Sequence, residues 1–97
     1  MVEKMLSETP IKLEKVEKKH LDCEILRLAI IAELDAVNLY EQLAAATNNR
    51  NIKKVLLEVA KEEKTHVGEF QTLLLKEDEE QVEELEKGEK EVEEIIE

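Results

Sequence analysis

Apolar residues recur along most of this chain at alternating intervals of three and four, which is the spacing of an α-helix with one buried face. Two segments carry the pattern clearly, and in each of them ionisable residues interrupt the apolar series. The first series is Cys23, Leu26, Ile30, Glu33, Val37, Tyr40 and Ala44, and the second is Ile52, Leu56, Val59, Glu63, His66, Phe70 and Leu73. Charged or titratable side chains therefore occupy positions that are normally apolar on a buried helix face.

The two series predict a helix from about residue 21 to 46 and another from about residue 52 to 76. The segment between them, Thr47-Asn-Asn-Arg-Asn51, is short and polar, and its Thr and Asn residues are good helix N-caps. We therefore expect an antiparallel hairpin. The first helix also carries a second apolar line through Leu28, Ile31, Leu39 and Leu43. One partner helix cannot cover so broad an arc, so more than two helices must meet.

The segments that flank the hairpin are less regular. Residues 1–20 are expected to form an N-terminal arm in which His20 is solvated rather than a ligand. Residues 77–97 are strongly acidic; Asp78 is a candidate N-cap there, and Gly88 interrupts a thin apolar stripe and indicates a helix stop. We expect short helices docked on the edge of a bundle or a partly mobile tail. The whole chain is then one small all-α domain.

Length, charge and cysteine content limit what such a domain can do. A core built from 97 residues is marginal by itself, so association with further copies is expected. The net charge of −11 argues against nucleic acid and anionic membranes as partners. The single Cys23 excludes a Cys-x-x-Cys zinc ribbon or rubredoxin-type iron centre. Because no apolar run is long enough for a membrane span or a secretory signal, we expect a cytoplasmic protein.

The ionisable residues in the two series have the chemistry of a metal site. Glu63 and His66 lie three apart on one helix face and can reach a single point, and carboxylate with neutral imidazole suits iron, manganese or zinc. A buried Glu33 without a partner would be costly, so we expect it to join them. A di-iron centre in a four-helix bundle needs two lone Glu residues and two Glu-x-x-His motifs. One chain therefore encodes half a site, which a two-fold related copy would complete.

The block from Glu33 to Gln42, E-L-D-A-V-N-L-Y-E-Q, followed thirty residues after Glu33 by Glu63-Lys-Thr-His66, resembles the encapsulated ferritins of the ferritin-like superfamily. The resemblance covers roughly residues 22–76. It implies a half-length ferritin hairpin that pairs into a four-helix bundle, with iron ligands at Glu33, Glu63 and His66 and a tyrosine, Tyr40, near the centre. It further implies two iron ions per dimer interface, dimers assembled into a decameric ring, and residence inside an encapsulin nanocompartment.

Five further positions bear on how such a centre would work. Tyr40 lies two turns after the first predicted ligand, where its hydroxyl could hydrogen-bond a ligand carboxylate across the bundle; a core tyrosine with a satisfied hydroxyl is the alternative. Family members often carry acidic residues one before and two after the first ligand, and here these positions are Ala32 and Asp35. Glu62 and Glu69 flank the ligand series and are either an approach path for iron or solubilising side chains.

The function that these residues favour is a ferroxidase, which binds two Fe(II) ions, passes their electrons to dioxygen and delivers Fe(III) to a storage compartment. A rubrerythrin-like di-iron peroxidase is one alternative, disfavoured by the missing Cys-x-x-Cys electron-transfer module. A non-enzymatic helical assembly module is another, in which Glu33, Glu63 and His66 form a buried polar network that fixes helix register. The metal content of the purified protein separates this last reading from the other two.

Overall fold

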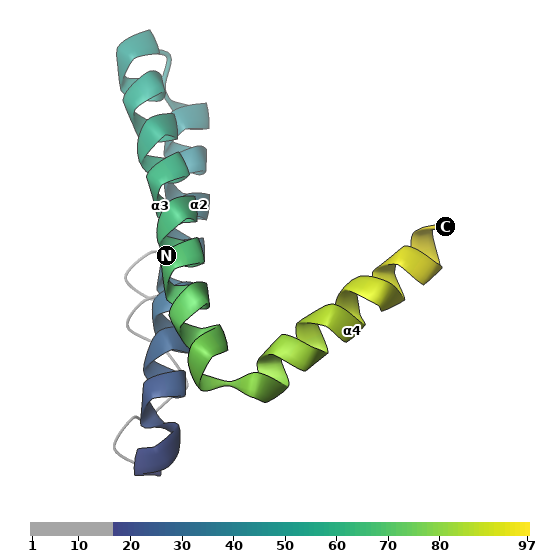
Figure 1. Ribbon diagram of the computed structural model, residues 1–97. Helices are drawn as coiled ribbons and strands as arrows, with labels where there is room; N and C mark the ends of the chain where they lie inside the picture. The colour runs from purple at the N-terminus through teal and green to yellow at the C-terminus, as the bar shows by residue number, and fades with distance from the viewer. Residues whose placement is uncertain (1–16) are drawn as a thin grey trace.

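The computed structural model describes residues 17–97, and all regular structure within them is helical. The elements are the 3₁₀ turn η2 (Lys18–His20) and the helices α2 (Leu21–Ala46), α3 (Arg50–Glu77) and α4 (Glu79–Ile96). Helices α2 and α3 lie side by side and antiparallel, whereas α4 leaves the open end of this hairpin at a wide angle (Figure 1). No helix in residues 17–97 is long and apolar enough to cross a membrane. Most of the predicted N-terminal arm, residues 1–16, lies outside the described part.

The hairpin confirms both helices that the periodicity predicts. Helix α2 has the predicted bounds, and α3 begins two residues before and ends one residue after the predicted limits. Asn49 determines where α3 begins, because its side-chain Oδ1 accepts hydrogen bonds from the backbone N–H groups of Asn51 and Ile52, both at 3.0 Å. The hydroxyl of Thr47 accepts a hydrogen bond from the N–H of Asn49 at 3.1 Å. The polar turn thus satisfies backbone groups that the helix start leaves unpaired.

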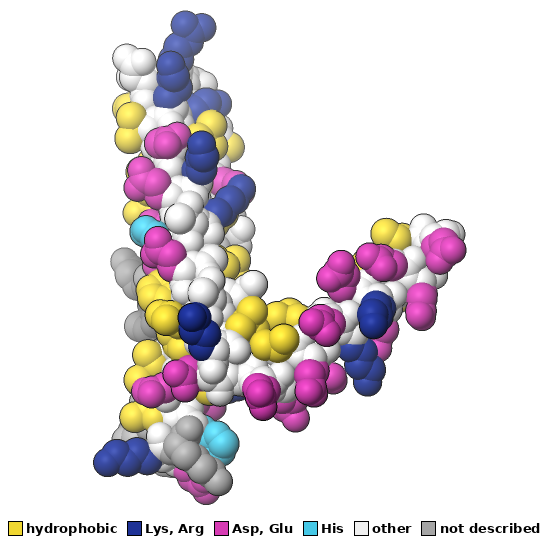
Figure 2. Space-filling view, in the orientation of Figure 1, with side chains coloured by type: hydrophobic (Ala, Val, Ile, Leu, Met, Phe, Trp, Pro, Cys, Tyr) yellow, Lys and Arg dark blue, Asp and Glu magenta, His cyan; other side chains and the backbone are white. Residues whose placement is uncertain are grey.

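A single chain buries few of its apolar side chains. The buried residues of the described part are Val37 and Ala44 on α2 and Ala60 and Leu74 on α3. Much of the hairpin's apolar surface stays open to solvent, and hydrophobic side chains are visible along its flank and in the angle between it and α4 (Figure 2). The exposed large apolar residues of the hairpin are Ile25, Ile31, Leu34, Leu43, Ile52, Val55, Leu57 and Leu73. This exposure agrees with the expectation that further helices cover the hairpin.

The contact line on α3 lies one residue beyond the predicted one. Ala60 and Leu74 are 2% and 5% exposed, whereas Ile52 and Leu73 of the predicted series are each 50% exposed. Two helices touch along a narrow line, and a small residue such as Ala60 lets the two backbones approach closely there. The predicted series instead follows the edge of that line and is left for a further packing partner.

Helix α4 corrects the prediction for the acidic segment. It is one continuous helix of 18 residues that passes through Gly88, so the predicted helix stop is wrong, whereas the prediction of helical structure after the hairpin is confirmed. A glycine ends a helix by taking a positive φ, and no residue in the described part does so. The strong helix formers Glu and Lys on both sides outweigh the cost of one helical glycine, about 1 kcal/mol relative to alanine. Helix α4 contains no buried residue.

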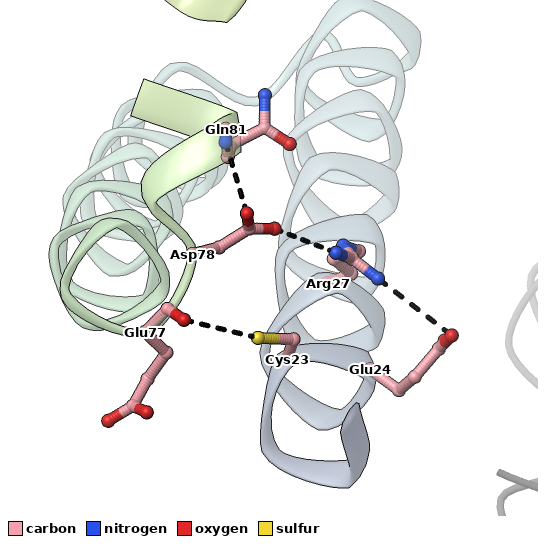
Figure 3. Close-up of polar contacts among 6 residues, drawn as sticks. All are labelled: Cys23, Glu24, Arg27, Glu77, Asp78 and Gln81. Atoms are coloured by element: carbon pink, nitrogen blue, oxygen red, sulfur yellow. Dashed lines mark hydrogen bonds and ion pairs between the residues drawn. The ribbon is translucent and has the colours of Figure 1, made fainter. Parts of the chain in front are cut away.

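A small polar cluster, which we call the elbow, joins α4 to the hairpin. It consists of Cys23 and Arg27 from α2, Glu77 and Asp78 at the end of α3, and Gln81 from α4 (Figure 3). Asp78 is the predicted N-cap: its Oδ1 accepts a hydrogen bond from the backbone N–H of Gln81 at 3.0 Å, and its Oδ2 accepts one from Arg27 Nη2 at 2.8 Å. Cys23 Sγ lies 3.9 Å from the carbonyl oxygen of Glu77. One carboxylate therefore caps α4 and ties it to α2.

Candidate metal centre

The three predicted ligands converge at the middle of the hairpin. Nδ1 of His66 lies 3.3 Å from Oε2 of Glu33 and 3.4 Å from Oε2 of Glu63. One potential ligand atom from each residue lies within 4.8 Å of those of the other two. Residues distant in the sequence, Glu33 on α2 and the Glu-x-x-His pair on α3, are thus brought to one point.

The hairpin register produces this convergence. Glu33 lies fourteen residues before Thr47, and Glu63 lies fourteen residues after Asn49, which are the two ends of the turn. Both helices rise by about 1.5 Å per residue, so equal separations from the turn place the two carboxylates at the same height. His66 then follows Glu63 by about one turn on the same face of α3. The caps that begin α3 consequently also set the alignment of the three predicted ligands.

The electrostatics of the cluster favour a cation. The side chains of Glu33 and Glu63 are 20% and 18% exposed, and that of His66 is 42% exposed. Within residues 17–97 neither of the two carboxylates forms an ion pair with a lysine or arginine; His66 is the only group that faces both. Two partly desolvated carboxylates that share one imidazole repel each other. A metal ion at this point would offset that repulsion.

The donor set fits a single divalent ion with coordination positions to spare. Metal–ligand distances of about 2.0–2.2 Å place ligand atoms roughly 3–4.4 Å from one another, which is consistent with the observed spread within 4.8 Å. Two oxygens and one imidazole nitrogen leave further positions open. The partial exposure of His66 leaves the cluster accessible from the side of the hairpin, where a second copy could add its own ligands.

Tyr40 lies apart from the cluster within one chain. It is half-buried on α2, and in the described part of the chain its hydroxyl forms no hydrogen bond with Glu33, Glu63 or His66. Seven residues along a helix correspond to about 10 Å, which separates it from Glu33 of the same chain. A contact with a ligand carboxylate across the bundle stays a prediction.

The other candidate positions stay on the surface. Glu62 and Glu69 are exposed, and their role as an iron path stays a prediction. His20 is exposed, as expected, and lines the pocket beside the elbow with Cys23 and Arg27. Arg27 was not predicted as a partner of Asp78. One feature of the sequence could have indicated this pairing: Arg27 is the only basic residue between Leu21 and Asn49.

Comparisons with known proteins agree with the all-helical fold. The family model described as Rubrerythrin matches residues 24–97. The ferritin-like–encapsulin shell fusion protein of Pyrococcus furiosus is 57% identical over 93 residues, which are 94% of this chain and 27% of that protein. The encapsulin nanocompartment cargo protein EncC of Myxococcus xanthus is 42% identical over 69 residues, 68% of this chain and 53% of that one. This chain therefore spans about a quarter to a half of the curated relatives it matches.

Among solved structures, the crystal structure of the encapsulated ferritin domain from Pyrococcus furiosus matches with a TM-score of 0.78 and 55% sequence identity. The match covers 91% of this chain and 88% of that chain. At this identity and coverage the likeness extends over the hairpin and beyond it.

Proposed function

This chain belongs to the rubrerythrin family of ferritin-like proteins, in its encapsulated-ferritin branch, and on that premise we propose that it is a ferroxidase. The observation that carries the proposal is the convergence of Glu33, Glu63 and His66 at one point of the hairpin. These three residues are the set that one half of a bundle-type di-iron centre requires. The hairpin of residues 21–76 with the acidic segment 77–97 is proposed to act as one half-ferritin-like domain.

The active unit proposed here is a pair of chains. Two hairpins related by a two-fold axis bring together four carboxylates and two imidazoles, which are enough to bind two ions. The apolar residues that one hairpin leaves exposed, such as Ile31, Leu34 and Ile52, would be covered in a four-helix bundle of this kind. Pairing thus completes both the core and the donor set.

The reaction proposed is a two-electron oxidation in which Fe(II) is the substrate. Two Fe(II) ions give one electron each to dioxygen, which takes up two protons, so that two Fe(III) ions and one hydrogen peroxide are formed. Glu33 and Glu63 hold the ions through hard carboxylate oxygens, which stabilise Fe(III) relative to Fe(II). Neutral His66 holds them through a ring nitrogen without adding charge. No side chain of the chain needs to act as a nucleophile.

The test measures Fe(II) oxidation and dioxygen consumption at matched iron. Glu33→Ala and Glu63→Ala should each reduce catalysed oxidation to the rate of iron in buffer, because each removes a ligand from both halves of the shared site. Glu58→Ala is the matched control, since it removes an exposed carboxylate of the same helix at a position with no proposed role in iron binding or entry. Wild-type dioxygen consumption by either ligand variant would overturn the assignment.

A rubrerythrin-like peroxidase is the second candidate, because the matching family model is the rubrerythrin one. Such an enzyme would reduce hydrogen peroxide to water with electrons from the two Fe(II) ions. The two activities separate when Fe(II) is oxidised in the presence of both oxidants. Peroxide consumption that exceeds dioxygen consumption would favour the peroxidase, and the reverse would favour the ferroxidase. If the protein binds no metal under any loading condition, both enzyme candidates are excluded and the helical assembly module is the remaining interpretation.

The setting proposed for the reaction is an encapsulin compartment in the cytoplasm. Two relatives support it by name, one as a fusion with an encapsulin shell and one as an encapsulin cargo protein. Co-expression with an encapsulin shell protein, followed by size-exclusion chromatography, should place this chain and its iron in the shell fraction. Separate elution of chain and shell would contradict this part of the proposal.

A further inference from the structure

The one tyrosine and the one phenylalanine of the chain lie at matched distances from the candidate metal centre. Tyr40 follows Glu33 by seven residues on α2, and Phe70 follows Glu63 by seven residues on α3. Seven residues are about two helical turns, or about 10 Å, so each aromatic residue lies on the same helix face as its glutamate. Because α2 and α3 are antiparallel (Figure 1), Tyr40 lies on the turn side of the cluster and Phe70 on the side of the open end.

Within one chain the two aromatic side chains are too far apart to touch. Tyr40 and Phe70 lie on opposite sides of the cluster, so about 21 Å of helix separates them. Two leucines stand seven residues before the two glutamates, Leu26 on α2 and Leu56 on α3. All four of these side chains are half-buried. Each side of the cluster therefore carries one aromatic residue and one leucine.

The charge of the hairpin indicates how a second copy faces the first. A two-fold axis through the cluster runs either along the helices, which puts both turns at one end, or across them, which puts each turn beside the partner's open end. Residues 42–57, around the turn, include three basic residues and no acidic one. Residues 21–28 and 70–78, at the open end, include four acidic and two basic residues. An axis across the helices brings these opposite charges together, which favours an antiparallel pair.

In an antiparallel pair the axis exchanges the two sides of the cluster. Residues on the turn side of one chain then share a layer of the four-helix bundle with residues on the open-end side of the partner. Tyr40 and Leu56 of one chain thus meet the partner's Leu26 and the partner's Phe70. Two aromatic rings in such a layer prefer an edge-to-face or offset stacked contact, with ring centres about 4.5–7 Å apart.

This layer offers the hydroxyl of Tyr40 no polar side chain, because its other members are leucine and phenylalanine. A buried tyrosine hydroxyl usually finds a hydrogen-bond partner. Long side chains on a helix lean toward its N-terminus, which on α2 is the direction of Glu33 and the cluster. A tyrosine ring held against the partner's Phe70 therefore keeps its hydroxyl directed at the ligand carboxylates and imidazoles.

We propose that Phe70 of one chain packs on Tyr40 of a second copy and holds the tyrosine hydroxyl toward the shared cluster. Phe70 is then a positioning residue, which acts on the reaction through Tyr40. This role rests on the proposed ferroxidase pair, but the contact itself requires only that two chains pair through their ligand faces. The contact can therefore be tested without iron.

Fluorescence detects the contact, because the chain has one tyrosine, one phenylalanine and no tryptophan. Chains with Phe70→Leu, which keep the tyrosine, are mixed with chains with Tyr40→Leu, which keep the phenylalanine, and Zn(II) is added to promote pairing. Excitation of phenylalanine should then give tyrosine emission by energy transfer between chains, in excess of the emission of Phe70→Leu chains alone. Energy transfer falls steeply with distance, so a parallel pair, whose two rings stay about 21 Å apart, should show little.

The mass of the mixture separates the two ways in which this test can fail. A paired mixture without energy transfer would overturn the contact between Phe70 and Tyr40 and leave the paired centre standing. A mixture that stays monomeric with Zn(II) would overturn both the contact and the paired centre. Far-UV circular dichroism checks that both variants stay helical.

Fe(II) oxidation separates a positioning role from a merely structural one. At saturating Fe(II), Phe70→Leu should lower the rate about tenfold, as changes to groups beyond the metal ligands commonly do. Tyr40→Phe lacks the hydroxyl and should lower the rate by a similar factor. If Phe70 acts through Tyr40, Phe70→Leu has no further effect in Tyr40→Phe chains. Leu57→Ala is the control, because it removes an exposed apolar side chain elsewhere on α3 and should keep the wild-type rate.

The double variant decides the positioning role. Losses that multiply in Tyr40→Phe/Phe70→Leu, or a wild-type rate in Phe70→Leu, would overturn it. A wild-type protein that does not catalyse Fe(II) oxidation would instead refute the ferroxidase proposal, and the energy transfer would still decide the contact.

Discussion

Glu33 and Glu63 direct their carboxylates at the same nitrogen of His66, and neither has a lysine or arginine partner in the described part of the chain. Each carboxylate is partly desolvated, and the two repel each other. Without metal the cluster therefore lowers the free energy of unfolding. The residues that are proposed to bind iron are the ones whose removal should harm the metal-free fold least.

This separation of function from stability can be measured by thermal or urea unfolding of metal-free protein. Glu63→Ala should change the free energy of unfolding by no more than about 1 kcal/mol, in either direction, while abolishing Fe(II) oxidation. Leu74→Ala is the contrast, because it empties a buried position of the same helix and should cost about 2–5 kcal/mol. If Glu63→Ala destabilises as strongly as Leu74→Ala, the carboxylate is a structural partner of His66.

Asp78 provides a pH-dependent prediction at the elbow. The backbone N–H of Gln81 and the guanidinium of Arg27, with a smaller effect of His20, hold the pKa of Asp78 below its ordinary value of 3.8. The folded state thus prefers the charged carboxylate. The stabilisation of the folded state by the charged Asp78 is present above pH 3.8 and is lost as the pH falls through the lowered pKa.

We therefore expect the start of α4 to lose helicity as the pH is lowered below about 4. Many glutamates titrate in the same range, so the measurement is the difference in circular dichroism between wild type and Asp78→Asn. Roughly one helical turn should be lost from the wild type in this range, whereas the variant should keep it, because the asparagine side-chain oxygen caps α4 and does not titrate. Identical pH profiles of the two proteins would show that Asp78 does not hold the elbow.

The sequence was sufficient to predict that Glu33, Glu63 and His66 come together, but not the elbow. Glu63 and His66 share a helix face by local spacing, and Glu33 is an acid in an apolar series, so both signals are visible without a structure. Arg27 and Asp78 are 51 residues apart and belong to different helices. No local rule pairs them, since the contact depends on where the open end of the hairpin places the start of α4.

At the level of the elements, the helix ends were predictable because their causes are local. Asn49 and Asp78 are N-caps by residue type and position, and the structure confirms both caps. The face of α3 that packs on α2 was predicted one residue away from Ala60 and Leu74, because the exact face depends on the partner helix. The effect of Gly88 was predicted wrongly, because whether a single glycine ends a helix depends on the helix propensities of its neighbours.

Helix α4 offers a direct test of that competition. Gly88 has helical backbone and a Cβ added to it would meet no atom within 4 Å. Gly88→Ala should therefore stabilise α4 by about 1 kcal/mol through backbone entropy and helix propensity. The helical signal should rise and the thermal transition of α4 should move to higher temperature. A decrease in helicity would mean that another chain packs closely against Gly88 in the assembly.

For the whole molecule, a centre shared by two chains links metal binding to pairing. Metal that binds only the pair stabilises it by about 2.7 kcal/mol when free metal is a hundred times its dissociation constant. Zn(II), which has no redox chemistry here, should shift the mass distribution by light scattering toward larger species, and a chelator should reverse the shift.

Glu33→Ala is the control for this linkage, because it removes one ligand from each half of the centre. It should abolish the response to metal but leave the mass of the metal-free protein unchanged. The wild-type protein must be shown to be metal-free at the start. If added metal then does not change its mass, apolar packing alone holds the pair.

The elbow makes each chain a bent unit, with the hairpin on one side of Asp78 and α4 on the other (Figure 1). In an assembly of several copies, α4 and the hairpin of one chain would face different neighbours, and the angle at Asp78 would fix the direction from one neighbour to the next. That direction decides whether successive copies close into a ring or continue as a filament. Arg27→Ala removes the ion pair with Asp78 and should let this angle vary. Native mass spectra should then show a broader distribution of the number of copies per particle than the wild type.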